Sequence, residues 1–502
     1  MNIFRKRDSS ASLRSSFHTA FAHQGCEARL HVVARTTATL FLTTALMLGE
    51  STIALAQYGQ GGGKDDHDSR QNDRGGKQDD NRGGRDDHGD ARDKDDHGAG
   101  EEKVLYIWAQ DQAQVAPDFL AVVDFDERSP KYGEVINVVP LPPPGNTGNE
   151  PHHCHLNSTK TILGCGGLLS LLKGQNGIFF FDVKDAKKPR FLFSAKAVES
   201  SMTDDFMPLE NGGFLITQMG SANGMAPGRV AEFDGNMHFV ANHFGPWSLF
   251  QEWPSEPPLD GFNPHGISAR PDLNLMMTSD FILPSSTLMG SMGPVLRGSV
   301  RIWDYRERKI TKTIDLFSPD GNPAQGTMDV KMLPKDRHGY GYSSGMFDGH
   351  IYLIDPARNT GEVAFDLSTV KPHVDSSTPG GMGQIMATPQ SGDRLIIGTF
   401  MAGQVVMLDA TDRHKLKQVS VVSFGENSGP HNIVLSSDDN RLVVTDYFLN
   451  EDAAGIIHFE GDHKVHVLKV THDTLTEDKR FKLDFNTAFK TGPARPHGIA
   501  MK

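Results

Sequence analysis

The chain lacks most of the features that would reveal a function at first sight. Its 502 residues include only 3 cysteines, too few for a disulfide framework. Acidic residues outnumber basic ones by 63 to 50, and the net charge of -13 argues against a nucleic-acid partner, which needs a basic face. The sequence contains no glycine-rich phosphate loop. These absences argue against a nucleic-acid-binding protein and a P-loop nucleotide hydrolase.

Long helical stripes of apolar residues are also scarce, and short apolar runs stand in their place. Runs such as Val104–Trp108 and Phe119–Phe125 have the length and the β-branched or aromatic content of strands. The 52 glycines and 28 prolines indicate many turns between them. The composition therefore predicts an all-β protein.

The few cysteines leave three interpretations open. Cys154 and Cys165 lie on neighbouring predicted strands, whereas Cys26 lies in a segment that we expect to be removed. A single disulfide is possible in an oxidising compartment, and two buried thiols are the second interpretation. The third is that Cys154 serves as a soft metal ligand.

The N-terminal segment has the pattern of an export signal. A basic stretch beginning at Arg5 precedes the apolar run Thr39–Leu48, and Ala54-Leu55-Ala56 supplies a small-x-small cleavage pattern. The apolar run is short for a membrane span. We therefore expect a signal peptide at residues 1–56, a periplasmic or secreted mature protein, and no stable membrane anchor after cleavage.

Residues 57–102 are predicted to be a disordered linker. The segment is dominated by Asp, Gly, His and Arg, and it contains too few apolar residues to offset the entropy of ordering. The tripeptide Asp-Asp-His recurs in it, ending at His67, His88 and His97. Such clusters can collect Cu or Zn weakly, or they can simply belong to a solvated spacer.

From residue 103 onward, a weak repeat of short strands begins. Its clearest part is a third strand that ends in aspartate, as in Phe179–Asp182, Val300–Asp304, Ile351–Asp355 and Val405–Asp409. The repeat spacing of roughly 45 to 70 residues is that of a four-stranded propeller blade with loop insertions. Seven such units can be counted.

The seventh unit is divided between the two ends of the chain. Its first strand begins near His497, shortly before the sequence stops at Lys502, so its other strands must come from residues 103–141. A strand from each end in one blade closes the ring and removes the open edge. The sequence thus predicts a seven-bladed β-propeller over residues 103–502, closed by N- and C-terminal strands in one blade.

A histidine follows a proline at the predicted start of the first strand in four units. In a propeller the first strand of each blade lines the central channel, so these residues would face one axis near one mouth. The seven predicted positions are His152 or His153, Asp204 or Asp205, His265, Asp329, Gln384, His431 and His497. Pro-His at a strand start can also reflect a turn preference alone, because proline fixes the entry angle of the chain. Pro372-His373 lies outside the repeat position, so the dipeptide by itself does not indicate a site.

Imidazoles converging on an axis predict a transition-metal site, because ring nitrogens suit Cu, Fe and Zn. The predicted metal ligands are His152, His153, His265, His431 and His497. Carboxylates and amides nearby can accept the other ring N–H and fix the tautomer. Asp205, Asp329 and Gln384 are the candidates for that role.

Several stretches resemble the selenium-binding protein family, whose bacterial members include copper-dependent methanethiol oxidases. The resemblance covers about residues 103–502 and rests on Ala116–Asp124, Ser129–Gly133, His152-His153 before Asn157, Asp260–Pro264, Arg301–Asp304, Gly429-Pro430 and His497. It implies a seven-bladed propeller and a metal held in part by His152, His153 and His497.

The chain also departs from the family pattern. Met202–Phe206 contains no histidine where the family carries a histidine-rich segment, and His265 and His431 stand where family members tend to have an acidic residue or glutamine. The arrangement is similar to the four-histidine iron of carotenoid-cleaving oxygenases.

We therefore expect a secreted metal-dependent oxidase that resembles copper methanethiol oxidase and oxidises a small thiol with O2, with His265 and His431 as catalytic residues. Copper is the expected metal, with iron and zinc as alternatives. A non-catalytic metal-binding propeller and a four-histidine iron oxygenase are the other two hypotheses.

Overall fold

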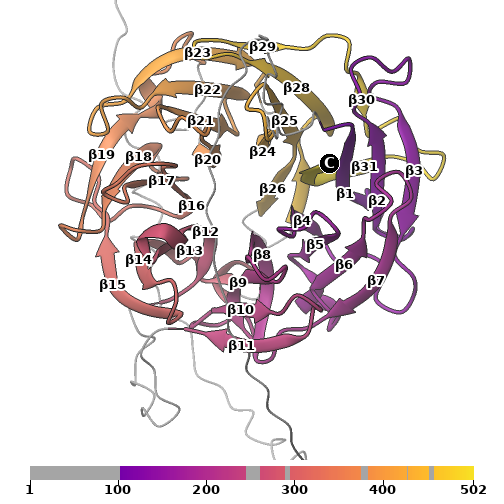
Figure 1. The fold of residues 1–502 in the computed structure, drawn as a ribbon, viewed down its shortest axis with the longest axis horizontal. Coiled ribbons are helices and arrows are strands. Elements are labelled where there is room, and N and C mark those ends of the chain that lie inside the picture. Colours follow the sequence, from indigo (N-terminus) through magenta and orange to yellow (C-terminus); the bar gives the residue numbers. More distant parts are fainter. Residues whose placement is uncertain (1–101, 245–260, 289–293, 375–382, 427, 452–456) are drawn as a thin grey trace, which may run out of the picture. The chain divides into compact units, whose positions relative to one another are not determined.

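A computed structural model describes residues 102–502, except 245–260, 289–293, 375–382, 427 and 452–456. The predicted signal peptide and most of the predicted linker therefore lie outside the described residues. The described unit is an all-β propeller of seven antiparallel sheets arranged in a ring (Figure 1). The prediction of seven blades is confirmed.

Blades one to three each contain four consecutive strands, ordered from the axis outward. Blade one contains β4 (Pro151–Leu156), β5 (Ile162–Gly167), β6 (Ile178–Asp182) and β7 (Arg190–Ala195). Blade two contains β8 (Ser200–Pro208), β9 (Phe214–Ser221), β10 (Arg229–Phe233) and β11 (Phe239–His243). Blade three contains β12 (Pro264–Arg270), β13 (Leu275–Ile282), β14 (Leu296–Asp304) and β15 (Lys309–Asp315).

Blades four and five repeat this order, and blade six carries an insertion. Blade four contains β16 (Thr327–Met332), β17 (Gly341–Gly345), β18 (His350–Asp355) and β19 (Thr360–Asp366). Blade five contains β20 (Gly383–Ala387), β21 (Arg394–Thr399), β22 (Gln404–Asp409) and β23 (Lys417–Ser423). Blade six contains β24 (Pro430–Leu435), β25 (Arg441–Asp446), β28 (Lys464–Val470), β29 (Leu475–Glu477) and the short β30 (Leu483–Asp484), with the hairpin β26 (Phe448–Glu451) and β27 (Ile457–Glu460) inserted after β25.

Blade seven closes the ring with strands from both ends of the described unit. The C-terminal β31 (Ala494–Met501) pairs antiparallel with β1 (Val104–Asp111), which continues to β2 (Phe119–Asp124) and β3 (Val135–Pro140) (Figure 1). The described residues contain four short helices, η1 (Ser170–Lys173), η2 (Pro271–Leu273), α1 (Pro284–Leu288) and η3 (Leu367–Thr369), none of which is long and apolar enough to cross a membrane. The predicted closure is confirmed.

The core consists of one apolar cluster at each interface between neighbouring blades. Strands such as β2 and β21 are buried on both faces, whereas outer strands such as β7 and β15 contain several exposed residues. Packing between blades therefore explains why many middle strands are rich in apolar residues. One cluster lies at each of the seven interfaces: between blades one and two, two and three, three and four, four and five, five and six, six and seven, and seven and one.

Each of the seven innermost strands carries a β-bulge near its beginning. In every case the inner strand has one residue more than its partner, as between Pro151 and Cys154 on β4 against Gly167 and Cys165 on β5. The other bulges lie between Thr203 and Phe206, Pro264 and Ile267, Thr327 and Val330, Gly383 and Met386, Pro430 and Asn432, and Pro496 and Gly498. A bulge interrupts the alternation of a strand and re-aims its side chains. The residues in these bulges include all the predicted axis positions.

Candidate metal centre

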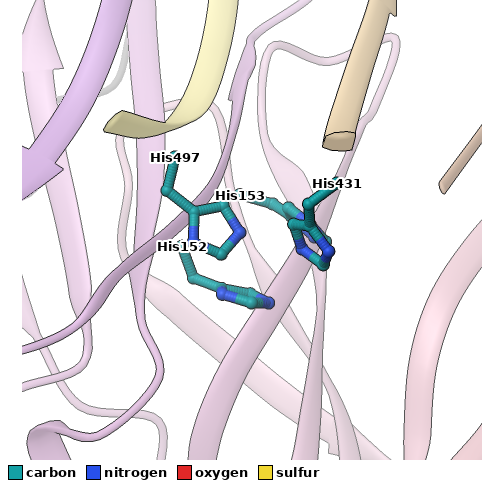
Figure 2. Close-up of side chains that lie close together, drawn as sticks. All are labelled: His152, His153, His431 and His497. Carbon is teal, nitrogen blue, oxygen red and sulfur yellow. The ribbon is translucent and has the colours of Figure 1, made fainter. Parts of the chain in front are cut away.

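Four histidines from three inner strands converge on one volume. His152 and His153 lie in the bulge of β4, His431 in that of β24 and His497 in that of β31, and each offers a ring nitrogen within 4.8 Å of the others. Figure 2 shows the four rings pointing toward one another. The ring centroids of His152 and His497 are 4.1 Å apart, and those of His431 and His497 are 4.6 Å apart. We call this set the four-histidine group.

The bulge of β4 explains how two adjacent histidines reach the same volume. Successive side chains of a regular strand point to opposite faces, but the extra residue breaks that alternation. The rings of His152 and His153 consequently lie 4.3 Å apart, 32° from parallel. One blade therefore supplies two members of the group.

His265 lies beside the four-histidine group, across a carboxylate. Its Nε2 is 3.0 Å from Asp204 Oδ2, and His153 Nδ1 is 2.9 Å from Asp204 Oδ1. His152 Nε2 lies 3.4 Å from the same carboxylate, so His152, Asp204 and His265 form a second possible ligand set. Asp204 is completely buried.

Of the three residues predicted to fix the histidine tautomers, only Gln384 bonds a histidine ring, whereas Asp205 and Asp329 bond backbone N–H groups. Gln384 Oε1 accepts a hydrogen bond from His431 Nδ1 at 2.7 Å, which directs Nε2 of His431 toward the group. Asp205 Oδ2 accepts the backbone N–H of Ile267 at 3.4 Å, and Asp329 Oδ2 accepts that of Met386 at 2.8 Å. Asp205 and Asp329 thus tie one inner strand to the next, and the carboxylate that contacts histidine rings is that of Asp204.

Four of the five buried imidazoles are held in the neutral form that binds metals. Burial lowers the pKa of His265 to about 4, and together with the neighbouring histidines it lowers the pKa values of His431 and His497 well below the usual range. Burial also lowers the pKa of His152, against the pull of Asp204. Neutral imidazoles expose a lone pair, which is what a metal ion requires.

Asp204 and His153 form an ion pair inside this group. Burial alone would raise the pKa of Asp204, but His265, His152 and His153 hold it well below the usual range. Burial lowers the pKa of His153, and Asp204 outweighs that effect, so the pKa of His153 is raised. Asp204 therefore carries a negative charge beside the group at neutral pH.

Several ring nitrogens of the cluster have no hydrogen-bond partner among the described residues. They are Nδ1 and Nε2 of His152, Nε2 of His153, Nδ1 of His265, Nε2 of His431, and Nδ1 and Nε2 of His497. Buried polar atoms without a partner cost free energy, and a cation bound between them removes that cost. The donor set of this group therefore fits a transition metal.

A buried tyrosine–glutamate pair borders the group and was not anticipated from the sequence. The Tyr447 ring lies 4.3 Å from that of His497, and its hydroxyl donates to Glu150, which also lies 3.4 Å from Arg495. Burial raises the pKa of Glu150 to about 7, although Arg495 and Tyr447 oppose it. Glu150 immediately precedes Pro151 and could have been suspected only from that position.

An apolar cluster lies next to His265, which one of its phenylalanines contacts. Leu169, Met202, Met219 and Ile282 are buried in it, with partly buried side chains that include Phe281 and Phe459. The Phe281 ring is 5.1 Å from that of His265, and the Arg495 guanidinium lies 3.6 Å above the Phe459 ring. His265 is therefore bordered on this side by an apolar side chain.

Cys154 and Cys165 are joined by a disulfide between β4 and β5. Of the three interpretations left open by the sequence, the structure contains the first. Cys154 directly follows His153, so the disulfide anchors the strand that carries two histidines of the group.

Comparison with known proteins gives a family and a fold. Residues 86–502 match the family model described as the 56 kDa selenium-binding protein. A methanethiol oxidase from a Hyphomicrobium species is 24% identical over 415 residues, which cover 77% of this chain and 84% of that protein. A methanethiol oxidase from Xenopus tropicalis is 23% identical over 379 residues, which cover 66% of this chain and 77% of that protein.

A solved structure also shares the architecture. A hypothetical selenium-binding protein from Sulfolobus tokodaii superposes with a TM-score of 0.64 at 16% identity, covering 81% of this chain and 94% of that protein. At this identity the likeness shows the fold alone.

Proposed function

This chain belongs to the 56 kDa selenium-binding protein family, and we propose that it is an exported, copper-dependent oxidase that uses O2 to oxidise a small thiol. The observation that carries the proposal is the four-histidine group. Its rings are buried, and His152, His431 and His497 have lowered pKa values and ring nitrogens without a partner. Distant homology to methanethiol oxidases points to an oxidoreductase.

Copper suits this donor set because imidazole nitrogens bind it well and because oxidation requires a metal that changes its oxidation state. When bound, copper would supply one-electron redox chemistry between the thiol and O2. The protein's own residues would orient the ligands: Gln384 holds Nδ1 of His431, and Asp204 holds Nδ1 of His153. Outer partners of this kind fix the tautomer and the direction of the ligating nitrogen.

A small apolar thiol fits the surroundings of the group. The apolar cluster reaches His265 through Phe281 and contains Met202 and Met219, whose thioethers would suit a methyl group. Tyr447 and Glu150 lie on another side of the group, where a hydroxyl and a carboxyl are available to hold a proton. This arrangement supports the substrate class implied by the homologues.

Export is supported by two observations. The sequence predicts a signal peptide at residues 1–56, and the propeller contains the Cys154–Cys165 disulfide. Disulfides persist mainly in oxidising compartments. We therefore propose the periplasm, or the medium outside the cell, as the place of action.

Metal analysis of the purified full-length protein tests the site. We expect about one tightly bound copper per chain, its loss in a His431→Ala/His497→Ala variant, and its retention in a His238→Ala control, whose ring lies on the surface with 78% exposure. His265→Ala should keep the copper with about 10- to 100-fold weaker affinity, because it acts through Asp204. Purified protein that contains no stoichiometric Cu, Fe or Zn would contradict the proposal.

Turnover separates the proposed function from its alternatives. We expect methanethiol to stimulate O2 uptake by the copper-loaded protein, and the His431→Ala/His497→Ala variant to show none. A protein that binds copper without O2 uptake would be a metal-binding propeller, and an electron paramagnetic resonance spectrum of non-haem iron would favour the four-histidine iron oxygenase. Either result would overturn the proposed oxidase.

A further inference from the structure

A second cluster of metal-ligating side chains lies in blade six, away from the four-histidine group. It contains Asp446 at the end of β25, Asp462 in the segment before β28, and His466 on β28. One ligand atom of each lies within 4.8 Å of the others. The Asp446 side chain is 0% exposed, and those of His466 and Asp462 are 12% and 22% exposed.

Glu477 directs the imidazole of this cluster. His466 Nδ1 lies 3.3 Å from Glu477 Oε1, while Nε2 lies 3.0 Å from Asp446 Oδ2 and 3.9 Å from Asp462 Oδ2. Phe424 stacks on the ring with centroids 3.9 Å apart and fixes its plane. In histidine metal sites, a carboxylate on one ring nitrogen commonly directs the other toward the ion. The Nε2 side of His466, where the two aspartates lie, is therefore the side on which an ion would bind.

The two aspartates are not equally provided with partners. Lys464 Nζ contacts Asp462 Oδ2 at 2.8 Å. Asp446 Oδ1, by contrast, is buried without a hydrogen-bond partner among the described residues. A buried carboxylate oxygen beside a second carboxylate is costly unless a proton or a cation satisfies it. The unpartnered atom is thus open to a bound ion, in addition to the ligand set that the three residues form.

We propose that Asp446, Asp462 and His466 form a second metal site, for a divalent cation such as Mn²⁺ or Zn²⁺. Carboxylate oxygens suit Mn²⁺, and an imidazole nitrogen is compatible with both ions. A cavity of about 780 Å³, lined by His466, Glu477 and Lys464 among others, borders the imidazole of the cluster. The ion would fix the end of β25, from which the chain continues directly to Tyr447 beside His431 and His497.

Manganese is the probe that separates this site from the four-histidine group, because Mn²⁺ prefers oxygen ligands and binds imidazole clusters weakly. Full-length protein stripped with a chelator is titrated with Mn²⁺, and the free ion is followed by its electron paramagnetic resonance signal. We expect one site per chain in the wild type and about 100-fold weaker binding in an Asp446→Asn/Asp462→Asn variant. Glu477→Gln should weaken binding about 10-fold, because Glu477 acts only through His466.

The matched control is His431→Ala/His497→Ala, which should retain the Mn²⁺ site while losing copper. Weak binding by the acidic N-terminal segment is common to all variants and cancels in the comparison. Equal Mn²⁺ binding by the wild type and by Asp446→Asn/Asp462→Asn would overturn the proposal and leave the cluster as an ion-pair network around His466. If the aspartate variant does not fold, the His431→Ala/His497→Ala variant is measured alone. Failure of this variant to bind Mn²⁺, together with a Tm that Mn²⁺ does not raise, would also overturn the proposal. Because the readout is neither copper nor thiol oxidation, failure here is distinguishable from failure of the proposed oxidase.

Discussion

At the scale of single residues, Asp118 holds the segment that leads into β4. Its buried carboxylate accepts hydrogen bonds from the backbone N–H of Asn149 at 2.8 Å, from the Asn149 side chain at 2.9 Å and from the backbone N–H of Gly148 at 3.3 Å. Burial nevertheless raises the pKa of Asp118 to about 6, because the loss of water outweighs these donors. The charge on this residue therefore opposes folding.

This pKa predicts a pH dependence of stability. The folded state binds the Asp118 proton more tightly than the unfolded state does, so the free energy of unfolding falls as pH rises from about 4 to about 6. An Asp118→Asn variant lacks this slope, and its stability relative to wild type should rise by up to about 3 kcal/mol over that window. Urea unfolding of both proteins at several pH values measures the difference. A difference that stays constant from pH 4 to pH 7 would contradict it.

The axis residues show what the sequence could and could not predict at this scale. The repeated Pro-His located His152, His265, His431 and His497 at blade starts, and all of them lie there. The sequence analysis expected Asp205 to contact the histidines, but Asp204 is the residue that does so. The bulge of β8 breaks the alternation of side chains from which their orientation is inferred, so the sequence could not distinguish the two. It also could not show that His265 lies across Asp204 from the group, since that depends on the positions of blades around the ring.

At the scale of elements, the hairpin of β4 and β5 is the best-anchored part of the site. Cys154 and Cys165 face each other across the hairpin, 11 residues apart in sequence, and their disulfide limits the unfolded chain. We expect a Cys154→Ala/Cys165→Ala variant to lose about 3 kcal/mol of stability, measured by chemical unfolding.

A reducing agent provides the matched control for this prediction. Dithiothreitol should lower the Tm of the wild type toward that of the double variant and leave the variant unchanged. Equal stability of the wild type with and without the reductant would show that the disulfide contributes nothing.

The elements differed in how far the sequence predicted them. Third strands such as β14 and β18 were predicted because a run rich in apolar residues ends in aspartate, and the structure has strands that end at those aspartates. The hairpin of β26 and β27 was not predicted. Its partly buried side chains, such as Leu449 and Phe459, pack against residues of other blades, which no local pattern records.

At the scale of the whole propeller, the pairing of β1 with β31 joins strands that are far apart in the sequence. Leu105 pairs with Met501, so the two strands are separated by nearly 400 residues. The backbone N–H groups of Lys103 and Val104 also donate to the Lys502 carbonyl. This closure covers the inner edge of β1. The ring is thereby completed by non-local contacts.

A truncation after Gly492 tests the closure. It removes β31, so we expect loss of cooperative thermal unfolding by circular dichroism, because β1 loses its partner and the cluster between blades seven and six is opened. The control is His497→Ala, which removes the same imidazole but keeps the strand and should unfold cooperatively near the wild-type Tm. A truncated chain that unfolds at the wild-type temperature would show that the ring does not need this strand.

The number of blades and the closure were the most predictable features of the fold. Both follow from counting repeats, and counting tolerates errors in the boundaries of individual strands. What surrounds the axis was less predictable, because each contact there joins residues of different blades.

The seven bulges have a consequence for how such a site can change over evolutionary time. Each extra residue lies outside the regular strand pairing, so replacing its side chain leaves the ladders of β4, β12 or β24 intact. An imidazole at one bulge can then be exchanged for a carboxylate or an amide without altering a strand pairing, whereas Asp205 and Asp329 also hold a neighbouring strand. Substitutions at the histidine positions can therefore change the ligand set at the axis while every strand ladder is kept.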